Sequence, residues 1–526
     1  MIASDAAAWR PRVNPWLIAL IVTLATFMEV LDTTIVNVSL PYIAGSMSSS
    51  NDQSTWTLTS YLVANGIVLP ISGWLSNRLG RKRFFLICIS AFTLFSLLCG
   101  IATSLPELIV FRLLQGLFGG GLQPSQQAIV LDTFPPEQRS RAFGVVAMAI
   151  IVAPVLGPTL GGWLTDHMSW RWVFLINVPI GMVTVLGVSA LVEDPPWLTR
   201  LRGAASGSID YIGLGLIALG LGCLQVVMDR GEDEDWFGSR FIVTFAILAA
   251  AGLVGAVLWL WRARHPVVNL RLLKDRNFAV GCLMIFCVGA VLYSSAVIIP
   301  QMAQLALGYT SLLAGLLLSP GAMVVIVMIP VVVTLMPHVQ TRWIVAFGFF
   351  TLGLALVYSH GVTPDIDFTT LVMMRTAQTL GLEFLFVPIG TIAFATLPRE
   401  MNNDATALFN MFRNVAGSIG IAAATAMVTE RTQVRMAHLV PHLTPLDPAF
   451  NQLLAQKTQA LTQLGTAPAN LTRTALGLID QTLYAQSTIG AYMDVFAYTA
   501  IISFLVVPLA FLFSPTRGGA APGGGH

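Results

Sequence analysis

Two carboxylic acids, Glu29 and Asp32, interrupt an oily stretch near the start of the chain. Three residues apart, they would share one face of a helix. An ionised carboxylate in the middle of a membrane costs at least about 2–3 kcal/mol, so such a group pairs with a cation, takes up a proton or faces water. Two acids this close also repel each other, which favours protonation of one of them. Asp32, alone or together with Glu29, could therefore carry a proton; a structural ion pair is the alternative for each.

The predicted partner of Asp32 is Arg112, in another apolar stretch. Counting the helical rise places both residues at similar depth, within reach of a long side chain. A contact that protonation breaks and restores would act as a two-state element. A second charged set comprises Arg375, Glu383 and Arg413. Glu383 could take protons or attract cationic substrates; the alternative is an internal ion pair with one of the two arginines.

The elements that must position these groups are apolar stretches long enough to cross a bilayer, which takes roughly 20 residues of helix. Hydrophobic residues make up 55% of the chain and charged residues only 10%. A soluble domain carries about 25% charged residues. The net charge of +2 comes with no basic stripe that would favour nucleic acid. We predict an all-α membrane protein with about fourteen spans, at 16–43, 55–76, 84–103, 107–131, 142–165, 172–192, 209–228, 240–261, 278–305, 311–336, 343–359, 369–396, 405–430 and 487–513.

An internal repeat predicts how these spans are grouped. Shifting the sequence by 263 residues lays 112–142 over 375–405 and matches Arg, Gln, Pro and Glu, which are rare in apolar helices. Parallel repeats of this kind build many secondary transporters. We therefore predict two six-helix bundles plus two additional helices. The expected domains are 1–192 (first bundle), 193–276 (linker with the two additional spans), 277–514 (second bundle, with an outer loop at about 432–486) and 515–526 (disordered tail).

The links between spans predict orientation and a surface helix. Most Arg and Lys residues lie in links on the same side of the membrane as the N-terminus. This bias predicts that both termini lie in the cytoplasm. In the loop at 432–486, apolar residues at helical spacing predict an amphipathic helix that either contacts a partner or caps the bundle. Those residues are Phe450, Leu453, Leu454, Leu461 and Leu464.

Two short segments rich in glycine could control movement. The segment 73–83 combines glycines for a tight turn with basic residues; its candidates are Gly73, Asn77, Gly80 and Arg81. The segment 153–162 combines small residues, which allow close helix contact, with prolines, which bend a helix. We interpret it as a gate or hinge, with general helix packing as the alternative. Its candidates are Pro154, Gly157, Pro158, Gly161 and Gly162.

At these residues the chain resembles the major facilitator superfamily, and more closely the fourteen-helix drug:proton antiporters of the EmrB/QacA type. The residues that carry the resemblance are Leu31–Val38 (first-helix signature), 73–83 (loop motif), Arg112–Gly116 (fourth-helix motif) and Ala153–Gly162 (antiporter motif of helix 5). Two positions depart from the family pattern. Asn77 stands where the loop motif usually carries aspartate, and Ala153 stands where the helix-5 motif usually begins with glycine.

The resemblance implies proton-coupled multidrug efflux by alternating access, from a bacterial inner membrane. It also implies a periplasmic adaptor of the EmrA type and an outer-membrane channel of the TolC type. We expect the proton gradient, without a cofactor, to drive transport, since no Walker A sequence occurs; no catalytic or metal-ligand spacing is found either. An adaptable pocket could draw on Phe27, Met28, Trp56 and Gln115. Proton-driven uptake of one metabolite is the alternative, although the helix-5 motif favours exchange.

Overall fold

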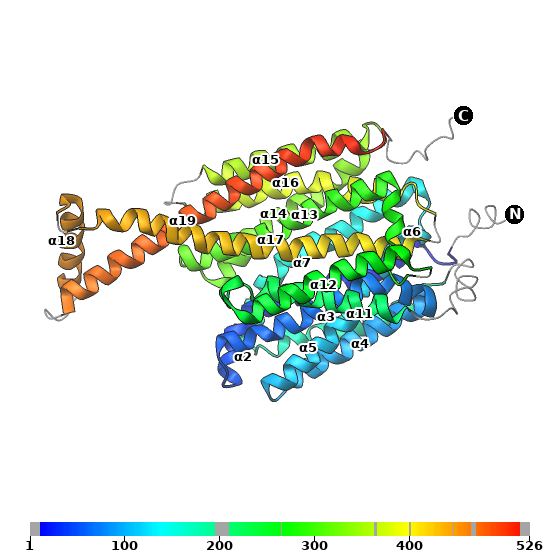
Figure 1. Cartoon of the computed structure of the whole chain (residues 1–526), viewed down its shortest axis with the longest axis horizontal. Coiled ribbons are helices and arrows are strands. Elements are labelled where there is room, and N and C mark those ends of the chain that lie inside the picture. Colours follow the sequence, from blue (N-terminus) through cyan, green and yellow to red (C-terminus); the bar gives the residue numbers. More distant parts are fainter. Residues whose placement is uncertain are drawn as a thin grey trace.

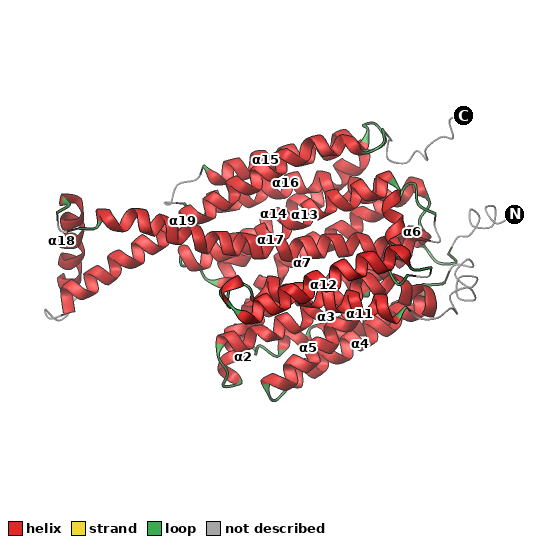
Figure 2. Cartoon of the chain, viewed as in Figure 1, coloured by secondary structure: helices red, strands yellow, loops and turns green. Residues whose placement is uncertain are grey.

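The computed structural model describes residues 11–194, 210–264, 266–361, 366–398, 401–444, 446–463 and 470–515. In those residues every regular element is a helix (Figure 2). Thirteen helices are long and apolar enough to cross a membrane, and α7 supplies a fourteenth when its two bent halves are counted as one span. The predicted all-α membrane protein with fourteen spans is confirmed. Residues 195–209 of the expected linker and 516–526 of the expected tail lie outside the described residues.

The helices of the first bundle are α2 (Pro15–Ser46), α3 (Asn51–Leu79), α4 (Arg81–Ile101), α5 (Leu105–Gly119), α6 (Leu122–Thr133), α7 (Pro136–His167), α8 (Trp172–Leu175) and α9 (Asn177–Leu191). The next two spans are α11 (Tyr211–Arg230) and α12 (Arg240–Arg262); α11 packs on α3, and α12 packs on α11. Short helical turns η1 (Trp236–Gly238) and η2 (Leu270–Lys274) flank α12.

The second bundle contains α13 (Arg276–Gln301), η3 (Met302–Ala306), α14 (Ser311–Leu335), α15 (Thr341–His360), α16 (Phe368–Ala393), α17 (Asn402–Leu439), η5 (Val440–His442), α18 (Pro448–Gln463), α19 (Leu471–Val506) and η7 (Val507–Leu512). Figure 1 shows the spanning helices running along the long axis of the molecule. We call the end where α2 begins and η7 ends the terminal end. The opposite end is the hairpin end, because α17, α18 and α19 project beyond the other helices there (Figure 1).

The two bundles meet along a few helix pairs. α7 packs against α14 and α16, while α17 packs against α3 and α6. α6 is buried along its whole length. It exists as a separate helix because the predicted span 107–131 breaks at the run Gly119–Gly121. A Cβ at Gly120 would lie 2.6 Å from the backbone oxygen of Asn65, so only glycine lets α3 come this close.

Two spans are longer than hydropathy predicted. α17 continues to Leu439, beyond the predicted end at 430, and α19 begins at Leu471, before the predicted start at 487. Apolar composition marks only the part of a helix that lies in lipid. The polar residues beyond it remain helical because the two helices support each other there, for example through Arg435 Nη2 and Asp494 Oδ1 at 2.7 Å.

The predicted amphipathic helix is present as α18. Its apolar side is covered by α19, and its two most buried residues are Phe450 and Leu461. This helix therefore closes the tip of its own hairpin and does not cap the bundle (Figure 1). Leu464 lies outside the described residues.

The contact of α3 with α5 is testable. A Cβ at Gly116 would lie 2.3 Å from the backbone oxygen of Tyr61, which cannot move without α3. Gly116→Ala should therefore destabilise the protein by about 1–3 kcal/mol, the usual cost of overpacking. The measurement is thermal unfolding in detergent. Gly66→Ala is the matched control, because nothing lies within 4 Å of a Cβ at that position. Equal unfolding midpoints for the two variants would contradict the close contact.

Candidate functional site

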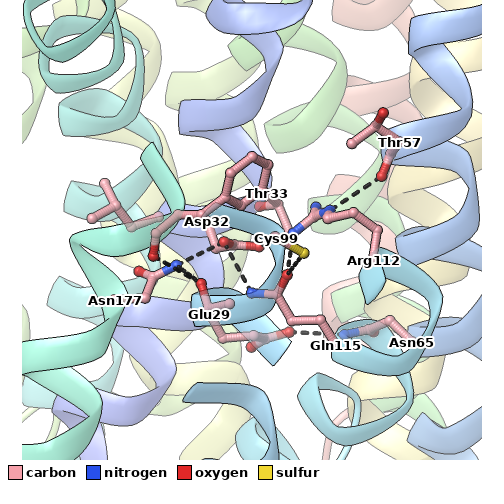
Figure 3. A network of polar contacts seen from close by, with 12 residues as sticks. Glu29, Asp32, Thr33, Thr57, Asn65, Cys99, Arg112, Gln115 and Asn177 are labelled. Atoms are coloured by element: carbon pink, nitrogen blue, oxygen red, sulfur yellow. Dashed lines mark hydrogen bonds and ion pairs between the residues drawn. The ribbon is translucent and has the colours of Figure 1, made fainter. Parts of the chain in front are cut away.

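Asp32 and Arg112 form an ion pair inside the first bundle (Figure 3). Arg112 Nη1 lies 2.5 Å from Asp32 Oδ2, and both side chains are fully buried. The other carboxylate oxygen, Oδ1, accepts hydrogen bonds from Asn177 Nδ2 at 2.7 Å and from Gln115 Nε2 at 3.2 Å. The contact predicted from helical depth is therefore present. Asp32 is surrounded by donors on both oxygens, as an ionised carboxylate requires in a buried site.

Neighbouring helices fix the guanidinium of Arg112. Its Nε donates to the backbone oxygen of Thr57 in α3 at 3.1 Å, and its Nη1 also donates to Gln115 Oε1 at 2.8 Å. The Tyr61 ring lies 4.2 Å from the guanidinium carbon, a cation–π distance. Gln115, a predicted pocket residue, thus belongs to the ion-pair network.

Glu29 lies on the same face of α2, and its contacts differ from those of Asp32. Glu29 Oε1 accepts from Asn65 Nδ2 at 3.0 Å (Figure 3), whereas Oε2 has no hydrogen-bond partner in the part of the chain described. The side chain is buried, with 3% of its surface exposed. Gln123 of α6 and Arg413 of α17 lie near enough to act on its charge. Glu29 therefore differs from Asp32 in having one oxygen without a hydrogen-bond partner among the described residues, and Arg413 of the other bundle reaches its neighbour Gln123.

Arg413 reaches across the interface between the bundles. Its Nη2 donates to Gln123 Oε1, and one turn away Asn410 Nδ2 donates to Gln127 Oε1 at 2.8 Å. These side chains form a polar seam between α6 and α17. The sequence placed Arg413 with Glu383, but the structure places it opposite Glu29.

The alternative that Glu383 pairs with Arg375 or Arg413 is wrong for the conformation described. Both Glu383 oxygens lack a hydrogen-bond partner among the described residues, and the side chain is fully buried. Arg375 lies eight residues earlier on α16, which is about 12 Å of helical rise. Its Nη1 donates to Ser295 Oγ at 2.8 Å, while its Nε has no partner in the described part. The second charged set is thus three separate charges.

The repeat explains the surroundings of Arg375. A shift of 263 residues carries Asp32 to Ser295 and Arg112 to Arg375. In both bundles the arginine contacts the residue at the matching position of the bundle's first helix. The second bundle therefore keeps the arginine and replaces its carboxylate with a hydroxyl.

The residues of the loop motif meet α17 at the terminal end. A Cβ at Gly73 would lie 2.9 Å from the backbone oxygen of Asn403, so the two helices touch there. Asn77 Nδ2 donates to Asp404 Oδ1 at 3.0 Å, and Arg81 forms a buried ion pair with Asp132. Gly80 adopts φ 92°, which glycine tolerates without strain.

A second contact joins the same groups across the interface. Asn402 Nδ2 donates to Asp132 Oδ1 at 3.0 Å. Asp132 therefore binds Arg81 in its own bundle and Asn402 of the other. The terminal end is closed by polar contacts between the bundles.

The helix-5 motif packs directly against the first-helix signature. A Cβ at Gly157 would lie 2.1 Å from Thr34 Oγ1, and one at Gly161 would lie 2.8 Å from the backbone oxygen of Ile35. α7 bends by 42° between Glu137–Pro154 and Leu156–His167. The prolines of this segment, Pro154 and Pro158, lie at and just beyond that bend; Gly162 is buried. The predicted bend is thus present; its role as a gate stays a prediction.

The other predicted pocket residues lie in separate surroundings. Met28 is fully buried in the main core, and Phe27 packs on a small cluster that includes Val30. Trp56 lies under the guanidinium of Arg230 at 5.2 Å. Hydrophobic type and position did not separate pocket from core, so their contact with substrate stays a prediction.

The sequence reading missed the uncharged polar residues of the site. Four amides hydrogen-bond the charged groups or join the two bundles: Asn65, Asn177, Gln123 and Asn410. Single amides within apolar helices form no sequence motif that would mark them. Ser295 could have been found, because the repeat marks it as the counterpart of Asp32.

Comparisons with known proteins agree with this architecture. The family model of the Major Facilitator Superfamily matches residues 22–421. The chain is 38% identical over 445 residues to the multidrug export protein EmrB of Haemophilus influenzae, covering 84% of this chain and 86% of that protein. It is 35% identical over 504 residues to EmrB of Escherichia coli, covering 96% of each. It is 33% identical over 503 residues to the fatty acid resistance protein FarB of Neisseria gonorrhoeae, covering 96% of each.

Solved structures share the fold at low sequence identity. The proton:xylose symporter XylE superposes with a TM-score of 0.57 at 12% identity, covering 94% of this chain and 96% of that one. The human organic anion transporter MFSD10 superposes with a TM-score of 0.56 at 14% identity, covering 94% and 100%.

The missing carboxylate beside Arg375 gives a stability test. Ser295→Asp places an acid where the first bundle has one, so it should pair with the buried guanidinium of Arg375. We expect the free energy of unfolding to rise by about 1–3 kcal/mol, which is part of the usual cost of an unpaired buried charge. Thermal unfolding in detergent measures this. Ser294→Asp is the control: Ser294 Oγ bonds the backbone oxygen of Val291 and not Arg375, so that variant should be destabilised. A lower melting temperature for both variants would refute the pairing.

Proposed function

The chain belongs to the major facilitator superfamily, and from this premise we propose that it exports hydrophobic and amphipathic compounds in exchange for protons by alternating access. The names of its relatives support export: EmrB is a multidrug export protein, and FarB a fatty acid resistance protein. The observation that carries proton coupling is the buried pair of acids on α2, next to an arginine in its own bundle and one in the other.

The two acids have different roles in this proposal. Asp32 keeps Arg112 in place, since both its oxygens already accept hydrogen bonds. Glu29 exchanges the proton, because one of its oxygens is unsatisfied and Arg413 lies across the interface. An ionised Glu29 attracts Arg413 and favours contact between α2, α6 and α17. A proton on Glu29 removes that attraction and biases the bundles toward separation.

The orientation follows from the basic links, which place both termini in the cytoplasm. The terminal end is then the cytoplasmic end. Its polar contacts, among them Asn402 with Asp132 and Asn77 with Asp404, hold the conformation described closed toward the cytoplasm. The transport cycle requires those contacts to break, so that substrate can enter from the cytoplasm or from the inner leaflet. An inner-membrane location of the protein is part of this proposal.

The hairpin end is then periplasmic and supports a tripartite pump. α17 has 38 residues, about 57 Å of helix, against about 30 Å for the hydrocarbon core. The apolar side of α18 is occupied by α19, so an adaptor of the EmrA type would contact its exposed side. That side is rich in amides, including Gln452, Gln456 and Gln459. A channel of the TolC type would complete the path across the outer membrane.

Proton coupling is tested with Glu29→Gln and Asp32→Asn in proteoliposomes with an imposed pH gradient and ethidium as the transported dye. Glu29→Gln should lower the uphill dye gradient that a given pH difference sustains while downhill exchange persists, because the amide can still accept from Asn65. Asp32→Asn should lower thermal stability by about 3–5 kcal/mol, because Arg112 would lose its counter-ion. Uphill transport at the wild-type rate by Glu29→Gln would rule out Glu29 as the proton carrier. The same result for both variants would rule out this network.

The adaptor contact is tested by comparing cells with vesicles. Replacing residues 440–470 by a short Gly-Ser linker should leave dye transport in proteoliposomes unchanged, because α18, the helix removed, lies beyond the bundle. Drug resistance of a pump-deleted Gram-negative host carrying the adaptor should be lost. Gln452→Lys with Gln456→Lys changes only exposed side chains and should also reduce resistance. Full resistance with the linker variant would exclude a required contact at the hairpin end.

A further inference from the structure

One carboxylate in the second bundle has no part in the network at Glu29. Glu383 lies near the middle of α16 and is 0% exposed, and neither oxygen has a hydrogen-bond partner among the described residues. The matching position in the first bundle, 263 residues earlier, is Gly120. The acid is therefore not a copy of a structural group that the fold requires in both halves.

No charged group among the described residues pairs with Glu383. The helices packed against α16 are α7, α13, α14 and α15. α14 contains no ionisable residue. The ionisable groups of the other three and of α16 itself are Glu137, Arg139, Arg141, Asp166 and His167 on α7; Arg276, Cys282, Cys287 and Tyr293 on α13; Arg342, Tyr358 and His360 on α15; and Arg375 on α16. None of them donates a hydrogen bond to Glu383, whose two oxygens have no partner among the described residues.

Such surroundings favour the neutral form of the acid. An ionised carboxylate without a cation, a hydrogen bond or water costs many kcal/mol in an apolar interior, whereas the neutral acid costs only a few. A bound proton takes up almost no space, so full burial of the side chain is compatible with the protonated acid.

The position of Glu383 also provides a way to release the proton. Glu383 lies seven residues before Gly390, and positions seven apart share a helix face. A Cβ at Gly390 would lie 3.8 Å from the ring of Phe143 on α7, in the other bundle. The face that carries Glu383 is therefore the face that α7 covers nearer the terminal end. When the bundles separate at that end, water can reach along this face to the acid, and ionisation becomes possible.

We propose that Glu383 is a second proton-carrying group, so that two protons are exchanged for each substrate molecule. The inference rests on the proposed proton-coupled export. Glu383 holds its proton while the terminal end is closed and gives it to water on the cytoplasmic side when α7 and α16 move apart. Its proton is bound separately from the one at Glu29, because the two acids lie on α2 and α16, in different bundles.

The test measures the steady-state dye gradient in proteoliposomes with a pH difference of about one unit and the membrane potential clamped at zero by potassium and valinomycin. Each coupled proton then sustains about a tenfold gradient. Wild type should reach about 100-fold and Glu383→Gln about tenfold. Glu383→Asp keeps an ionisable group and should retain the wild-type gradient. Thr379→Val, one turn away on α16 and equally buried, is the matched control and should also match wild type.

Three results would overturn the proposal: a wild-type gradient of only about tenfold, an unchanged gradient in Glu383→Gln, or a complete loss of uphill transport in that variant. If Glu383→Gln does not fold, Glu383→Met offers an apolar side chain of similar length, with the same expected gradient. Failure of the proposed function looks different, because wild type itself would then sustain no gradient driven by the pH difference.

Discussion

A charge buried among apolar helices must have a partner, and the Asp32–Arg112 ion pair meets this requirement for the first bundle. It is completed by Thr57 on α3, Gln115 on α5 and Asn177 at the start of α9. Lipid supplies no strong hydrophobic force between helices, so packing and polar contacts decide how they associate. These few bonds therefore fix both the depth and the rotation of each helix. Displacing one of the helices would leave an ion in an apolar interior without its counter-ion.

The two halves share a backbone plan but carry different chemistry. Arg112 and Arg375 occupy matching positions, and each donates to the first helix of its bundle. In the first bundle the acceptor is a carboxylate, and in the second it is the hydroxyl of Ser295. The only intramembrane carboxylate of α16, Glu383, lies too far along the helix to replace it. The two halves thus share a frame, whereas the second bundle contains ionisable groups, Arg375 and Glu383, that form no ion pair among the described residues.

The sequence was sufficient for the spans, the repeat and the Asp32–Arg112 contact. Each depends on a quantity that can be counted along the chain: apolar length, offset or helical rise. It was not sufficient for Arg413, which was grouped with Arg375 and Glu383 but contacts Gln123 beside Glu29, because the rotation of one bundle against the other leaves no periodic signal. It also missed Asn65, Gln123 and Asn177. An amide in a membrane helix is too common to stand out, whereas a charge is rare and does.

α7 is the element that can connect proton exchange to movement of the bundles. Gly157 lets it lie against Thr34, two residues beyond Asp32, and Thr159 on the same segment would touch a Cβ at Gly315 of α14. Its bend at Pro154 lies between Gly157, which contacts α2, and Phe143, which reaches α16. Packed helices respond to a small displacement by repacking and not by stretching. We therefore expect a change in the contacts of α2 to reach the second bundle through α7, which has a bend between the two contact regions.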